Sequence, residues 1–173
     1  MSIFSDSKGD IFPGRRYVPM NKTEELIEEA EAHGAEVIDW RFQTDRIKGL
    51  YCDGVIAMSK DIDTSAEKTC VLAEELGHHL TASGDILDQK DSFNRKQELK
   101  GRIWAYNRLI GLRGIVSAYI AGCRNRYEIA QELNVTENML QEAVDYYHEK
   151  YGCYTMLDNY VIYFSPLGVM ERI

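Results

Sequence analysis

The sequence predicts an α+β protein that is mostly helical, with a small antiparallel or mixed sheet in its N-terminal third. The sheet is predicted by β-like stretches at 37–42 and 47–59 and by the hairpin turn signal Asp53-Gly54 inside the second stretch. The helices are predicted by long runs of helix-favouring residues with recognisable start and stop signals. With 173 residues the chain is long enough to bury a core, and we predict one domain over 1–173.

The other expected elements follow in order along the chain. Residues 1–20 hold two of the three prolines and predict an irregular arm. The expected helices lie at 23–33, 64–81, 96–110 and, as a helix–turn–helix-like pair, within 127–151. Gly34 provides a stop signal for the first helix. The polar residues 83–95 predict a connection, and 159–170 predict a final strand followed by a turn.

Composition excludes several classes of protein. The apolar runs are too short to span a bilayer, and the N-terminus lacks the apolar segment of a secretion signal, so we expect a cytoplasmic protein with no membrane partner. The four cysteines lack CxxC spacing, which argues against a zinc knuckle, and without an export signal we expect them to be reduced rather than paired in disulfides. The net charge of −8 repels the phosphate backbone of nucleic acids.

The pair of helices within 127–151 has the apolar spacing of a DNA-binding helix–turn–helix. Its second helix is acidic, however, with one lysine against Glu137, Glu142, Asp145 and Glu149. A helix that enters the major groove needs basic or amide side chains. We therefore expect a structural pair or a protein-docking surface, and no direct binding of nucleic acid.

The helix expected over 64–81 carries the residues that indicate chemistry. It begins with Thr64-Ser65-Ala66-Glu67, the pattern of a capping box. At 100° per residue, one side of the helix gathers the core-facing residues Thr69, Ala73, Leu76 and Leu80. Glu74 and His78 lie nearly opposite, and Glu75 lies about a quarter-turn away. The helix thus presents two carboxylates and an imidazole together, which indicates a metal site.

Spacing explains why this set is suited to metal chemistry. Side chains at i and i+4 project in parallel and can hold one ion, and in the motif H-E-x-x-H the intervening Glu is the general base. Here the segment is Glu74-Glu75-Leu76-Gly77-His78, so the first ligand position holds Glu rather than His. Glu75 keeps the position of the base and His78 that of the second ligand.

Several segments resemble the ImmA/IrrE metallopeptidases, in the form found among prophage-encoded members. They are VLAEELGHHLTASGDI (71–86), KQELKGRIWAYNRLIGL (96–112), NRYEIAQELNV (125–135) and the tail NYVIYFSPLG (159–168). The resemblance covers the chain from about residue 23. It implies a zincin-like fold and a zinc-dependent endopeptidase. Known members of the family cleave helix–turn–helix repressors of prophages, mobile elements or stress-response genes, which implies such a repressor as the partner.

The resemblance also implies roles for individual residues. His78 would be a metal ligand, Glu75 the base that deprotonates water, and Glu98 the third ligand. Glu74 stands where the family has its first histidine. Two carboxylates and one imidazole favour harder ions as well as Zn²⁺, so Mn²⁺ is an alternative cofactor.

Some alternatives stay open at this point. Asp85 could supply an oxygen ligand in place of another carboxylate. His79 could swing in as a ligand or act as a supporting residue, and His148 could approach from the C-terminal helix. Because Glu74 replaces a histidine, a second hypothesis is a weakly active or inactive zincin-like module that regulates a repressor by binding it.

Overall fold

A computed structural model of the chain describes residues 21–81 and 91–172. Its helices are α1 (Lys22–Ala32), α2 (Ser65–Thr81), α3 (Asp91–Leu109), α4 (Gly111–Ile120), α5 (Arg126–Leu133) and α6 (Glu137–Tyr151). Its strands are β1 (Glu36–Trp40), β2 (Gly49–Cys52), β3 (Val55–Ser59), β4 (Tyr154–Leu157), β5 (Tyr160–Phe164) and β6 (Leu167–Glu171). Helices dominate and the sheets are small, which confirms the α+β fold class. None of these helices is long and apolar enough to cross a membrane.

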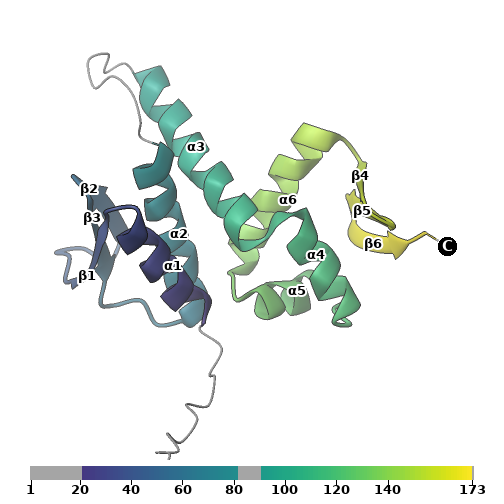
Figure 1. Cartoon of the computed structure of the whole chain (residues 1–173), viewed down its shortest axis with the longest axis horizontal. Helices are drawn as coiled ribbons and strands as arrows, with labels where there is room; N and C mark the ends of the chain where they lie inside the picture. The colour runs from purple at the N-terminus through teal and green to yellow at the C-terminus, as the bar shows by residue number, and fades with distance from the viewer. Residues whose placement is uncertain (1–20, 82–90, 173) are drawn as a thin grey trace, which may run out of the picture.

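The first sheet is mixed and has the order β1-β3-β2 (Figure 1). β1 runs parallel to β3, with Glu36 opposite Val55, and β2 runs antiparallel to β3. The turn between β2 and β3 is Asp53-Gly54, and both residues have positive φ, 46° and 81°. Two positive φ values are typical of the hairpin turn that this dipeptide favours. The predicted hairpin and the predicted N-terminal sheet are both confirmed.

The first sheet and α1 pack against one side of helix α2, and α3 packs against its other side (Figure 1). The Thr64 hydroxyl accepts a hydrogen bond from the Glu67 amide at 3.1 Å, which caps the start of the helix. Thr69, Ala73 and Leu76 are fully buried, as the helical wheel predicts. The buried Thr69 hydroxyl lies 2.7 Å from that of Thr23 and so joins α2 to α1.

Helix α3 begins at Asp91, five residues before the predicted start at Lys96. Polar composition predicts that 91–95 belong to the connection, but polar residues are also compatible with a helical turn. The long helix packs along α2 and also contacts α6. It therefore links the two ends of the molecule (Figure 1).

The C-terminal segment corrects the sequence prediction. In place of one strand and a turn, 154–171 forms a second sheet, antiparallel, in the order β4-β5-β6. Each strand has only four or five residues, and the Ser165-Pro166 turn joins β5 to β6. Ile162 and Phe164 are buried on the face toward the helices. The short strands are stabilised by this packing rather than by a local sequence signal.

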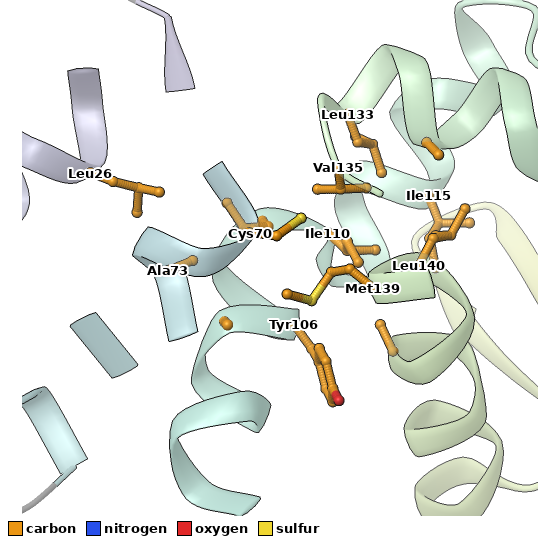
Figure 2. Packing of buried hydrophobic residues seen from close by; sticks show 14 of the residues in the cluster. Leu26, Cys70, Ala73, Tyr106, Ile110, Ile115, Leu133, Val135, Met139 and Leu140 are labelled. Atoms are coloured by element: carbon orange, nitrogen blue, oxygen red, sulfur yellow. The ribbon is translucent and has the colours of Figure 1, made fainter. Parts of the chain in front are cut away.

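The core is continuous across the described residues from α1 to the second sheet. Figure 2 shows where helices from the two halves of the chain meet, around Cys70 of α2, Ile110 beyond α3 and Met139 of α6. The start of α6 is fixed here, because Thr136 caps it by accepting a hydrogen bond from the Met139 amide at 3.1 Å. The Thr136 amide in turn donates to Cys70 Sγ at 3.3 Å. The predicted helix pair at 127–151 is thus part of the same packed body as α2.

Lys22 ties together the ends of two helices. Its ammonium donates to the carbonyl of Leu133, the last residue of α5, at 2.7 Å, and to that of Leu109, the last residue of α3, at 3.3 Å. Burial lowers the pKa of Lys22. The two carbonyl groups lie at helix C-termini, where a positive charge is stabilised.

We expect Lys22→Met to lower the free energy of unfolding by about 1 kcal/mol, because both carbonyls lose a charged donor. Urea titration followed by circular dichroism measures this change. Lys60→Met, at an exposed position, is the control. If both variants unfold at the urea concentration of the wild type, the contact contributes nothing to stability.

Candidate functional site

Glu75 lies on α2 beside the first sheet. The backbone N–H of Tyr51, on β2, donates a hydrogen bond to Glu75 Oε2 at 2.8 Å. Burial raises the pKa of the Glu75 carboxyl, while His78 and the Tyr51 amide act in the opposite direction. A carboxylate that is oriented by a backbone donor and has a raised pKa is suited to accept a proton from water.

His78 and Glu98 face each other across the contact between α2 and α3. The distance from His78 Nε2 to Glu98 Oε2 is 3.4 Å. The imidazole is mostly buried and the carboxylate is half exposed, so a ligand can approach the pair from the solvent side. An imidazole nitrogen and a carboxylate oxygen are both donors that zinc accepts. The structure therefore brings together two of the residues predicted as metal ligands.

Arg102 holds the second oxygen of the same carboxylate. Its Nε donates to Glu98 Oε1 at 3.1 Å, one helical turn along α3. The Glu98 carboxylate is thus shared between a guanidinium and an imidazole. This contact fixes the orientation of the carboxylate, and it also offsets part of its negative charge.

Glu74 lies in a cavity of about 410 Å³ between α2, α3 and α6. The cavity lining also includes Arg102 and Glu142, but it does not include His78. Burial raises the pKa of Glu74 to about 7, and the charge of Arg102 only partly opposes this effect. Glu74 is thus a partly buried carboxyl group in the same cavity as the Arg102 guanidinium. Its role as a metal ligand stays a prediction.

The raised pKa of Glu74 makes stability depend on pH. Between its ordinary value of 4.5 and about 7, the folded protein keeps a proton that the unfolded chain has lost, so stability decreases as pH rises through this range. Glu74→Gln removes this dependence. In metal-free protein, we expect the free energy of unfolding of Glu74→Gln, taken relative to that of the wild type, to increase by about 1–2 kcal/mol from pH 5 to pH 8. Urea unfolding at both pH values tests this, and a difference that does not change with pH would contradict it.

His79 is occupied by structural contacts. Its Nδ1 lies 3.0 Å from the Tyr51 hydroxyl and its Nε2 lies 3.0 Å from the His33 carbonyl. The ring also packs edge-on against that of Tyr51. Both nitrogens are therefore engaged in joining α2 to β2 and α1, which favours the supporting role for His79 over that of a ligand.

Two further donors were considered from the sequence, Asp85 and His148. Asp85 lies outside the described residues. His148 is exposed near the end of α6. Across 21–81 and 96–172 there is no group of three or more His, Cys, Asp or Glu side chains arranged to hold a metal ion. The donor types of His78 and Glu98 fit a divalent ion, and this described part supplies two of the three expected ligands.

Two contacts of the site were missed from the sequence. Tyr51 positions Glu75 through a backbone amide, which leaves no signal in residue type. Arg102 follows Glu98 by four residues, a spacing at which an ion pair is expected on any helix. This spacing is visible in the sequence, but by itself it indicates only an exposed helix face.

An α+β domain whose central helix bears a base-position glutamate, and a histidine that faces a glutamate of the next helix, belongs to the zincin-like class in its fold. A model of the Peptidase_M78 family, described as the IrrE N-terminal-like domain, matches residues 30–145, which is more than half of the chain. The chain belongs to this peptidase family. The resemblance to ImmA/IrrE proteins is thereby confirmed. No curated protein matches the chain in sequence.

Proposed function

We propose that this protein is a metal-dependent endopeptidase, with Glu75 as the general base and His78 and Glu98 as ligands of a divalent ion. The observation that carries the proposal is the 3.4 Å approach of His78 Nε2 to Glu98 Oε2, one turn along α2 from an oriented Glu75. Membership of a peptidase family supports the same conclusion.

Each residue of the site has a defined task in this proposal. His78 and Glu98 hold the ion, and Glu74 or another oxygen donor completes its shell. The bound ion, Zn²⁺ or Mn²⁺, supplies Lewis acidity for hydrolysis of a peptide bond. The Tyr51 amide fixes Glu75 Oε2, which leaves Oε1 to take a proton from water and pass it to the leaving amine.

The proposed substrate is a helix–turn–helix transcriptional repressor, and the proposed location is the cytoplasm. Family membership supports a protein substrate. The acidic face of α6 and the net charge of −8 favour contact with a basic protein over contact with DNA. A repressor with a basic DNA-binding surface has the matching charge.

A second candidate function is supported by two observations. The described residues hold no complete three-residue metal group, and Arg102 already occupies one oxygen of Glu98. A protein with this arrangement could bind a repressor and regulate it without cleaving it. The two candidates differ in whether an ion binds with the help of His78 and Glu98.

Titration calorimetry with Zn²⁺ separates the two candidates. We expect the wild type to bind one ion. Loss of a residue that only supports a metal ligand typically weakens metal affinity by about 10–100-fold, and we expect His78→Gln and Glu98→Gln to weaken it further than that. Glu149→Gln, at an exposed position of α6, controls for the loss of one negative charge. Equal affinity in all four proteins would exclude the proposed ligands.

The activity itself is tested with a purified helix–turn–helix repressor. We expect limited proteolysis that stops with a chelator and returns with added Zn²⁺ or Mn²⁺. Binding of the repressor without cleavage, at any metal concentration, would support the second candidate and reject the endopeptidase.

A further inference from the structure

Glycines from two neighbouring elements face the two side chains that carry the proposed chemistry. Gly101 of α3 is buried against the His78 ring: a Cβ atom added there would lie 2.7 Å from His78 Nδ1 and 2.9 Å from Cε1. Gly49, the first residue of β2, faces Glu75 in the same way. A Cβ atom there would lie 2.9 Å from Glu75 Cγ and 2.6 Å from Val71 Cγ1.

These distances leave no room for a side chain. Non-bonded carbon atoms attract each other best at about 3.5–4.0 Å and repel strongly below about 3 Å. Any residue other than glycine at position 101 or 49 would therefore displace the neighbouring side chain. The atoms that must move belong to His78 in one case and to Val71 and Glu75 in the other.

Backbone conformation does not explain either glycine. Neither Gly49 nor Gly101 has a positive φ, so neither needs the conformational freedom of glycine. Gly101 lies in the interior of a helix, where alanine is the more stabilising residue. What glycine provides at these positions is empty space.

Gly77 shows by contrast what a purely structural glycine looks like in this protein. A Cβ atom at Gly77 would lie 2.4 Å from the backbone oxygen of Gly101, so this glycine allows the two helices to approach each other. The nearest atoms to Gly101, in contrast, are those of the His78 ring. The two glycines of the crossing thus have different tasks.

The arrangement on α3 explains how the ring is held. Glu98 and Gly101 are three residues apart and lie on the same face of the helix. The Nε2 edge of the His78 ring faces the Glu98 carboxylate, and the Nδ1 edge lies against Gly101. One face of α3 therefore offers an acceptor at Glu98 and, one turn later, a residue without a side chain against which the ring packs.

We propose that Gly101 and Gly49 are positioning residues, whose missing side chains create the space in which the His78 imidazole and the Glu75 carboxylate are held. The chemical consequence rests on the function proposed above. The geometric consequence does not, since displacement of the ring can be measured without any metal or substrate.

A double-mutant cycle between positions 101 and 78 tests the geometric part. We expect Gly101→Ala to lower the melting temperature by several degrees in the wild type. In a His78→Ala background the clash is gone, and the same change should leave the melting temperature unchanged or raise it. Equal effects in both backgrounds would mean that Gly101 serves helix packing alone, and would overturn the proposal.

Two further measurements follow the ring and the ion in the full-length protein. In Gly101→Ala we expect altered ring ¹H–¹⁵N resonances of His78, assigned by their loss in His78→Gln, and at least a tenfold weaker affinity for Zn²⁺. Gly49→Ala should slow cleavage and leave the His78 resonances in place. Gly168→Ala, where a Cβ atom meets nothing within 4 Å, is the matched control.

For Gly101, the outcomes keep this inference apart from the proposed function. If the wild type binds no Zn²⁺, the metal site fails, while the cycle and the resonances still decide the role of Gly101. If Gly101→Ala matches Gly168→Ala in His78 resonances and in Zn²⁺ affinity, the positioning role of Gly101 is wrong. If Gly49→Ala cleaves the repressor as fast as Gly168→Ala, the proposed positioning role of Gly49 is wrong.

Discussion

Glu75→Gln is expected to reduce cleavage of the repressor by at least about 10²–10⁴-fold, the contribution typical of a general base. Glutamine has the shape of glutamate and can still accept the hydrogen bond from the Tyr51 amide through its carbonyl oxygen. It cannot take a proton from water at neutral pH. The chemical step is therefore lost while the fold and the neighbouring pair remain. Gel densitometry of the intact repressor over time measures the rate.

Two controls make this result specific. Zn²⁺ affinity in Glu75→Gln should stay within a few-fold of the wild type, because His78 and Glu98 are untouched. Glu149→Gln, which removes a distant charge, should cleave normally. If Glu75→Gln cleaves as fast as the wild type, Glu75 is not the base, and the proposed mechanism fails even if the protein is a peptidase.

Gly77→Ala should have the largest effect on stability, a loss of about 2–3 kcal/mol, in the upper part of the range for an overpacked core. The added Cβ atom would lie 2.4 Å from the oxygen, 3.0 Å from the carbon and 3.1 Å from the Cα of Gly101. All three are backbone atoms, so no side chain can rotate away to relieve the clash. The two helices must separate instead.

Chemical denaturation measures this loss, with Gly114→Ala of α4 as the control. A Cβ atom at Gly114 comes no closer than 3.3 Å, and it meets only the flexible end of Leu133. Gly77→Ala should also pull Glu98 away from His78 and weaken the binding of Zn²⁺. An unfolding midpoint equal to that of Gly114→Ala would show that the helices tolerate the extra atom.

The features predicted well from the sequence are those encoded by adjacent residues. The capped start of α2 at Thr64 and the Asp53-Gly54 hairpin depend on contacts within a few residues, and both are present. The facing of Glu74, Glu75 and His78 away from the core stripe depends only on helical periodicity. Local patterns of this kind are visible in a single sequence.

The features that were missed depend on contacts between distant segments. The second sheet needed the packing of Ile162 and Phe164 against helices to make such short strands stable. The contact between Tyr51 and Glu75 joins residues that are 24 positions apart, and it uses a backbone amide that every residue except proline has. Glu98 was placed by family resemblance, and only the structure shows its carboxylate facing His78.

Helix α3 couples the candidate site to the far half of the molecule. Glu98 is half exposed, whereas Ala105, Tyr106 and Leu109, further along the helix, are buried in the core with α6. From Leu109 to Glu98 the helix extends about 16 Å, so a tilt of about 5° at its buried end displaces the carboxylate by about 1.4 Å. A shift of that size exceeds what catalytic geometry tolerates. The packing of the buried end of α3 against α6 therefore bears on the geometry of the distant pair, because any tilt of the helix is multiplied along its length.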